Sequence, residues 1–260
     1  MRCCRLCGEE TGLSGSHILP RAFFKKAKGS GAQLVRLNSQ HAIEPKLENG
    51  DWIEDLLCPA CEHFLNDSYE SSQIRFLRNY KNTHKSHQKL TFRRFDFTNM
   101  YLFWLSIIWR ASVSSLAPFE TVAFGPELNE IMRRLIRSQT TYVDGVCFSE
   151  ILQVGLMKVL PEDGMDSDMV NKLISSPLLK STDDTFTYTM LVEGFLVAFH
   201  FGTASHPKLP KNFGQIKKSL FLRIPRLQVH QSAEASEIFM MAASKAESFP
   251  NWRPLGRKKR

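Results

Sequence analysis

The sequence predicts an α+β fold in which a small cysteine-rich part precedes a larger domain. Five of the six cysteines and five of the eight histidines lie before residue 95. Long apolar segments follow, first with helical periodicity and then as runs rich in β-branched and aromatic residues. That order favours helices packed on an antiparallel sheet. We therefore expect two domains, residues 1–95 and residues 96–260.

The expected elements follow from the positions of Pro and Gly and from hydrophobic periodicity. Pro20 can open a helix of good helix formers, which Gly29 ends. Pro59 opens a second helix, whose apolar residues recur at helical spacing to about Tyr80. Strands or short segments are expected at residues 13–19, 33–38 and 51–57. In the larger domain we expect helices at residues 100–115, 127–136 and 233–247, and strands at residues 142–148, 153–160, 185–201 and 220–229.

Composition narrows the class of protein before any motif is considered. A chain of 260 residues with 43% hydrophobic residues can bury a core, which excludes general disorder. The net charge of +8 favours a polyanionic partner. The N-terminus lacks the apolar stretch of a signal peptide, so we expect a cytoplasmic protein with reduced thiols. The apolar run at residues 100–109 is shorter than the ~20 residues that cross a bilayer, so we expect no membrane contact.

Two cysteine pairs with the same spacing indicate a metal site. Cys4 and Cys7 form one pair, and Cys58 and Cys61 form the other. The turn between two such cysteines presents both sulfurs to one ion, and two turns complete a tetrahedral site for zinc. A site with four sulfur ligands has no open position, so this zinc would stabilise the fold and perform no chemistry. Cys3 and Cys147 are expected to be ordinary free thiols.

The cysteine pairs also stand in a fixed order with a third motif. In chain order the motifs are Cys4-x2-Cys7, Ser16-His-Ile-Leu-Pro20, and Leu56-Leu-Cys58-x2-Cys61-Glu62. This order resembles that of the HNH endonuclease superfamily over about residues 3–75. The resemblance implies a zinc-stabilised ββα-metal module in front of the larger α+β domain. It also implies a hydrolase that cleaves DNA phosphodiester bonds, for example in bacterial restriction or anti-phage defence.

The resemblance further implies roles for individual residues. His17 would be the base that activates the water attacking phosphorus. A divalent cation, Mg²⁺ or Mn²⁺, would stabilise the charge on the leaving oxygen. Its ligands would be Ser16, Glu62 and Asn66, and the last two share a helix face because they are four residues apart.

Two further positions in the loop between the cysteine pairs could contribute to this site. The resemblance implies an asparagine that orients the base, and Asn49 is the candidate, with Asn38 as the alternative. His41 could be an additional metal ligand or a solvated loop histidine.

A run of basic residues follows the second cysteine pair. No acidic residue lies between residues 71 and 92, and the cations there recur every three or four positions, as on one helix face. A solvated face is the alternative to a strip that neutralises nucleic-acid phosphates. The strip consists of Arg75, Arg78, Lys81, Lys85 and Lys89.

Two other functions remain open at this point. The first is a catalytically degenerate, zinc-stabilised module that binds nucleic acid without cutting it. The second is a protein-interaction scaffold. Residues 96–260 could supply sequence specificity, a surface for a protein partner or a homodimer interface.

Overall fold

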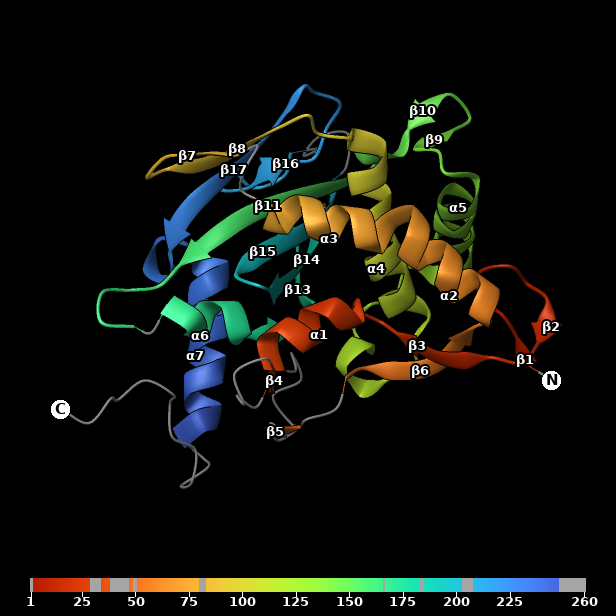
Figure 1. Cartoon of the computed structure of the whole chain (residues 1–260), viewed down its shortest axis with the longest axis horizontal. Coiled ribbons are helices and arrows are strands. Elements are labelled where there is room, and N and C mark those ends of the chain that lie inside the picture. The colour runs from red at the N-terminus through yellow and green to blue at the C-terminus, as the bar shows by residue number, and fades with distance from the viewer. Residues whose placement is uncertain are drawn as a thin grey trace.

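The computed structural model describes residues 2–28, 34–37, 47–48, 51–79, 83–165, 167–182, 185–202 and 208–247. Within these ranges the fold is mixed α and β, which confirms the predicted α+β class. The largest β-sheet contains one parallel pair of neighbouring strands, β11 (Leu152–Leu160) and β17 (Phe221–Gln228) (Figure 1). Its other neighbouring strands are antiparallel. Its strands run in the order β13 (Leu178–Ser181), β14 (Thr185–Val192), β15 (Phe195–Gly202), β11 (Leu152–Leu160), β17 (Phe221–Gln228), β8 (Lys89–Arg93) and β7 (Thr83–Lys85), and β16 (Gly214–Gln215) also pairs with β11.

The N-terminal part contains two antiparallel strands followed by a helix. β3 (Ser14–His17) pairs with β6 (Ile53–Leu57), and a helix begins directly after Cys58. This helix has three segments: α2 (Pro59–Leu65), the π-helical η1 (Asn66–Glu70) and α3 (Ser71–Arg78). The other elements here are β1 (Arg2–Cys3), β2 (Glu10–Thr11), α1 (Arg21–Lys28), β4 (Leu34–Leu37) and β5 (Leu47–Glu48), and β4 also pairs with β12 (Ile174–Ser175).

The helix α4 (Phe97–Val113) is the centre of the larger part. Every residue from Met100 to Ala111 is buried, because the helix is covered by α5 (Gly125–Ser138), by η1 and α3, and by the sheet. A helix that is apolar all round is typical of such a position. Asp96 caps its N-terminus by accepting a hydrogen bond from the Asn99 backbone N–H at 3.0 Å. In the described ranges, no helix has both the length and the apolarity required to cross a bilayer.

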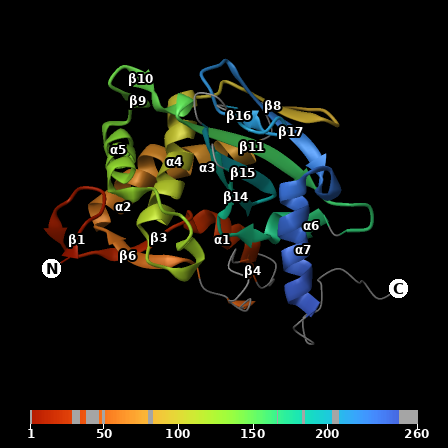
Figure 2. The same cartoon turned by 180° about the vertical axis from the view of Figure 1, so that it is seen from behind.

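The sheet is covered on both faces. On β15, Val197 and Phe199 belong to the core around α4, whereas Leu196 and Ala198 face a second core. That second core contains residues of α6 (Ser167–Lys172) and α7 (Ala233–Glu247). Figure 2 shows α7 beside the sheet and α4 next to α5 and α2. The short elements that complete the fold are β9 (Tyr142–Val143), β10 (Val146–Cys147), η3 (Ala117–Phe119), η4 (Phe148–Glu150) and η5 (Val229–Gln231).

Two segments differ from the sequence-based expectation. The chain leaves the helix after Arg78, and residues 83–93 form the hairpin of β7 and β8. Leu90 and Phe92 bury their side chains there and β8 pairs with β17, so the tertiary pairing overrides the helical spacing of the cations. The expected strand at 185–201 is two strands, because Glu193 and Gly194 form a turn with φ of 49° and 69°.

The hairpin also changes how residues 1–95 relate to the rest of the chain. β7 and β8 are strands of the large sheet, and one continuous core contains Leu6, Leu57, Trp104 and Ile224. The N-terminal part therefore packs as one layer of a shared core.

A close backbone approach gives a test of this packing. An added Cβ on Gly214 would lie 1.9 Å from the carbonyl oxygen of Arg223 on the neighbouring strand. We expect Gly214→Ala to lower the free energy of unfolding by about 2 kcal/mol or more, measured by urea denaturation. Gly12→Ala is the matched control, since no atom lies within 4 Å of its added Cβ. Equal stability of the two variants would contradict the β16–β17 contact.

Candidate metal centre and active site

The two cysteine pairs meet at one point. The sulfur atoms of Cys4, Cys7, Cys58 and Cys61 all lie within 4.8 Å of one another. The Cys7 and Cys58 sulfurs are 3.9 Å apart, and four sulfurs at ~2.3 Å from a tetrahedral zinc ion would be ~3.8 Å apart. The cluster can therefore hold a metal ion, and its geometry is compatible with structural zinc.

The electrostatics of the cluster favour a bound cation. Burial opposes ionisation of Cys4, but hydrogen bonds from the backbone N–H groups of Cys7, Cys58 and Leu6 outweigh it and lower the pKa of Cys4 to about 7. Burial raises the pKa of Cys61, and its sulfur neighbours raise it further. Several thiolates so close together repel one another, and a cation at their centre removes that repulsion.

The first cysteine pair is held in place by the helix α5. Arg133 donates from Nη1 to the carbonyl oxygen of Leu6 at 2.8 Å, and Arg137 donates to that of Cys7 at 3.2 Å. The Arg5 backbone N–H donates to the Leu56 carbonyl oxygen at 2.9 Å, which ties the same turn to β6. Both pairs are thereby fixed relative to the end of β3.

A pocket of about 420 Å³ lies beside the cluster, at the end of β3 and along one side of α2 and η1. It brings together His17, Glu62 and Asn66, three residues that the sequence analysis assigned to the base and the catalytic metal. The same pocket contains Arg21, Glu70 and Arg110, which the sequence analysis did not assign to the site.

The acidic and amide groups of the pocket come from one side of the continuous helix formed by α2 and η1. Asn66 and Glu70 lie on η1, and a π-helical segment inside an α-helix often marks a functional site. The Oε1 atom of Glu62 is buried and has no hydrogen-bond partner among the described residues. A buried, unpaired carboxylate oxygen is costly, and a cation could satisfy it. The side-chain oxygen Oδ1 of Asn66 accepts a hydrogen bond from Ser71 Oγ at 3.0 Å.

His17 is held by contacts from two other elements. Its Nε2 lies 3.3 Å from Oδ2 of Asp51, a residue just before β6. Its carbonyl oxygen accepts a hydrogen bond of 2.7 Å from Nη1 of Arg110. A proton on Nε2 that is shared with Asp51 leaves Nδ1 as the nitrogen able to accept a proton.

Arg110 connects His17 to the π-helical segment η1. This side chain is 1% exposed, and its Nη2 lies 2.7 Å from Oε1 of Glu70. The motifs did not reveal Asp51, Glu70 or Arg110, which contact His17 directly or through Arg110. Arg110 directly follows the apolar run of residues 100–109, and this position was its signal in the sequence, because a buried guanidinium requires partners.

Ser16 does not join the other expected metal ligands. It is fully buried, and its hydroxyl accepts a hydrogen bond from the Leu57 backbone N–H at 2.9 Å. The same hydroxyl donates to the Ser14 carbonyl oxygen at 3.4 Å. Ser16 is not among the residues that line the pocket. Neighbouring residues on a strand face opposite sides, so Ser16 points away from the side that His17 occupies. It connects β3 to β6.

The cations of the expected strip do not form one row. Arg75 is exposed on α3 and lines an adjoining groove of about 690 Å³ with Arg21 and Arg78. Arg78 is paired with the buried carboxylate of Glu193 and donates to the Ala22 carbonyl oxygen at 2.8 Å. Lys85 and Lys89 lie on β7 and β8, so the single helical row predicted from spacing is wrong. Asn38, His41, Asn49 and Lys81 lie outside the described residues.

The cysteine cluster generates a prediction about metal content. We expect the purified chain to contain about one zinc ion by elemental analysis, and Cys58→Ser to lose most of it. The Tm of this variant should fall by about 10 °C, as expected for a loss of about 3 kcal/mol in a chain of this length. Cys3→Ser is the control, because Cys3 is exposed and outside the cluster. Zinc that survives Cys58→Ser would contradict the site.

Comparison of the chain with protein-family models, with curated proteins and with solved structures gives no match. Function is therefore inferred from the pocket and from the order of the motifs.

Proposed function

We propose that this protein is a metal-dependent HNH-type endonuclease that hydrolyses DNA phosphodiester bonds. The observation that supports the proposal is the pocket in which His17, Glu62 and Asn66 meet beside the four-cysteine cluster. Two antiparallel strands and a helix position these residues, which is the order that the resemblance implies. In this proposal zinc at the cysteines stabilises the fold.

The residues of the pocket fit a hard divalent cation such as Mg²⁺ or Mn²⁺. Glu62 offers a carboxylate oxygen that lacks a partner, and Asn66 offers an amide carbonyl oxygen. Oxygen donors of this kind suit Mg²⁺ and Mn²⁺. When bound, the cation would supply stabilisation of negative charge on the phosphate oxygens.

His17 would take the proton from the attacking water. Asp51 would stabilise the imidazolium that forms, because its Oδ2 lies 3.3 Å from Nε2 of His17. Arg110 holds the backbone of His17, so the imidazole would approach the attacking water from a fixed strand end. Neither Asp51 nor Arg110 needs to touch the substrate for this role.

The basic residues nearest the pocket would position the nucleic acid. Arg21 lines both the pocket and the adjoining groove, and Arg75 lies in the groove on the exposed side of α3. Arg75 forms no ion pair within the described part of the chain, so its charge is available to a phosphate. Arg78 is less suited, because Glu193 neutralises its guanidinium.

A second candidate function is a zinc-stabilised module that binds nucleic acid without cleaving it. The inward orientation of Ser16 favours this alternative, because it removes one of the three expected metal ligands. The two candidates differ in whether binding of nucleic acid is followed by hydrolysis.

The role of His17 can be tested by plasmid cleavage. With Mg²⁺ or Mn²⁺, we expect the parent protein to nick supercoiled DNA and His17→Ala to be slower by about 10²-fold or more, because the general base is lost. His230→Ala is the control, since His230 is an exposed histidine paired with Glu162. Circular dichroism should show that all three proteins are folded. Unchanged cleavage by His17→Ala would refute the assignment of the base, and DNA binding by a parent that never cuts would support the second candidate.

The role of Arg75 can be tested by the salt dependence of DNA binding. Arg75→Gln should weaken binding to all sequences and reduce the slope of log K against log[salt] by about one, because one phosphate contact is lost. Lys217→Gln is the matched control, because Lys217 is exposed in the loop before β17. If both variants bind DNA with the parent's slope, the groove is not the nucleic-acid surface.

A further inference from the structure

A second pocket, of about 490 Å³, lies at the end of β11, where residues of β7, β8, β17 and α6 also line it. The register places Lys85 opposite Leu90, Leu90 opposite Ile224, and Lys158 opposite Arg226. Positions two apart on a strand face the same side, so Arg226 shares the face of Ile224. The side chains of Lys85, Arg226 and Lys158 are therefore on one face of the sheet, and all three line the pocket.

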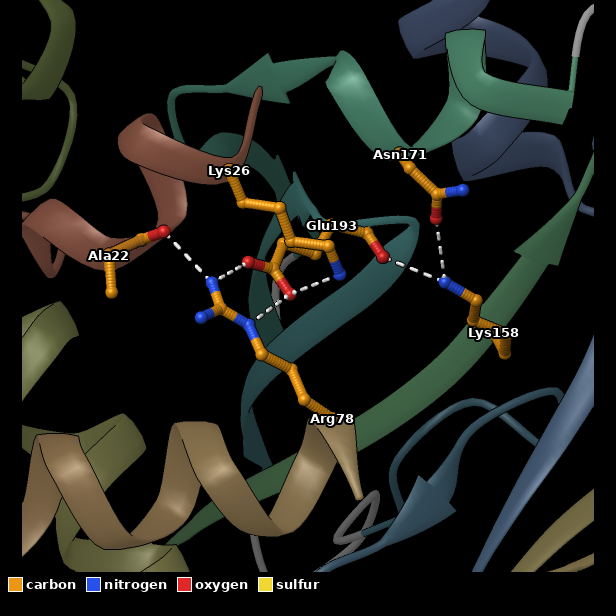
Figure 3. A network of polar contacts seen from close by, with 6 residues as sticks. All are labelled: Ala22, Lys26, Arg78, Lys158, Asn171 and Glu193. Carbon is orange, nitrogen blue, oxygen red and sulfur yellow. Dashed lines mark hydrogen bonds and ion pairs between the residues drawn. The ribbon is translucent and has the colours of Figure 1, made fainter. Parts of the chain in front are cut away.

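Lys158 is held in a fixed, largely buried position. Its Nζ donates to the carbonyl oxygen of Glu193 at 2.7 Å and to Oδ1 of Asn171 at 3.1 Å (Figure 3). The ammonium also lies 4.5 Å from the centre of the Phe195 ring. These contacts use two of the three N–H donors of the ammonium. An added Cβ on Gly194 would lie 2.6 Å from Nζ, so the turn itself leaves space for this lysine.

The positive charge around Lys158 exceeds the negative charge that the described residues supply. Glu193 is the carboxylate that acts electrostatically on Lys158, and it is already shared by Lys26, at 3.1 Å, and Arg78 (Figure 3). Burial is the largest cause that lowers the pKa of Lys158, which falls to about 8. The positive charges of Lys26, Arg226 and Lys85 also lower this pKa, whereas the carboxylate of Glu193 raises it. None of the described residues that line the pocket is acidic.

Two features of Arg226 indicate that, among the described residues, the pocket lacks a negatively charged partner. It stands directly beside Lys158 in the parallel pair of β11 and β17, and like charges that face each other across strands are destabilising. Its Nη1 donates to the Ser86 carbonyl oxygen, but its Nε is buried without a hydrogen-bond partner among the described residues. An anion between these side chains would remove both costs.

The rest of the pocket is apolar, and its apolar residues are Leu90, Val159, Leu160, Pro161 and Val170. A site of this size with an apolar wall and a few convergent polar groups is typical of small-ligand sites. We propose that this pocket binds a small organic phosphate monoester, with the phosphate at Lys85, Lys158 and Arg226 and an apolar body against the wall.

Two features select this ligand class. Three cations match a phosphate monoester, which carries −1.5 to −2 charges near pH 7, better than the single charge of a carboxylate. The ammonium of Lys158 is largely buried, so a terminal phosphate reaches it more readily than a phosphodiester inside a chain. The site shares no lining residue with the pocket of His17 and is independent of the proposed cleavage.

Phenyl phosphate is a suitable probe, and isothermal titration calorimetry without divalent metal measures its affinity. We expect phenyl phosphate to bind the parent more tightly than inorganic phosphate, benzoate or phenol do. Lys85→Met and Lys158→Met should each weaken phenyl phosphate about tenfold, as expected when one charge-assisted hydrogen bond is lost. Lys85 is exposed, so its variant should fold even if Lys158→Met does not.

Three controls separate this site from the others. Lys217→Met removes an exposed lysine elsewhere, Arg75→Met removes a cation of the groove, and His17→Ala removes the proposed base. All three should bind phenyl phosphate as the parent does. Absence of phenyl phosphate binding, equal affinity for phenyl phosphate and inorganic phosphate, or equal losses in Lys85→Met and Arg75→Met would each overturn the proposal.

Lys158 also gives the binding a pH dependence. The probe stays a dianion above pH 7, because its second pKa is about 6. Lys158 faces Lys26, Lys85, Arg226 and Glu193, and it loses its proton as the pH rises through about 8. The affinity of the parent should therefore fall between pH 7 and pH 9, and that of Lys158→Met should fall less. Parallel pH profiles would show that Lys158 does not contact the phosphate.

Discussion

The buried guanidinium of Arg110 is the interaction on which the candidate active site depends. It projects from the buried helix α4 and donates to the backbone of His17 and to the carboxylate of Glu70, each at 2.7 Å. A buried charge is tolerated only when its donors are paired, so these contacts fix the end of β3 and the π-helical segment relative to each other. Ser114 and Ser115, at the end of the same helix, donate to the Glu54 carboxylate on β6. The helix therefore holds both strands of the β3–β6 pair, and the pocket lies at the end of β3.

This dependence explains why the N-terminal part does not stand apart from the rest of the chain. The cysteine cluster fixes the two turns, but α5 holds the first turn through Arg133 and Arg137. Arg78, at the end of α3, reaches the buried Glu193 in the turn between β14 and β15. The same turn accepts a hydrogen bond from Lys158 in the second pocket. Arg78 lines the groove beside the candidate site and Lys158 lines the second pocket, so the turn at Glu193 connects these two places.

The sequence predicted the fold class and the elements whose signals are local. Motif order pointed to His17, Glu62 and Asn66 as candidates, and the fold brings these three residues into one pocket beside the cysteine cluster. Ser16 was misplaced, although its position beside His17 on a strand already implied the opposite face. Asp51 could not be inferred, since no spacing relates a residue before β6 to the end of β3. The positions of Lys85 and Lys89 depend on pairing with β17, far along the chain, which helical spacing does not reveal.

The proposed function requires that Glu62 and Asn66 hold a divalent cation beside His17. Anomalous diffraction from crystals of the zinc-loaded chain soaked in Mn²⁺, recorded above the manganese edge and below the zinc edge, tests it most directly. We expect a manganese peak at the oxygens of Glu62 and Asn66, on the side of His17, that is absent from crystals of Glu62→Gln. A pocket without manganese, in crystals whose cysteine cluster contains zinc, would contradict it.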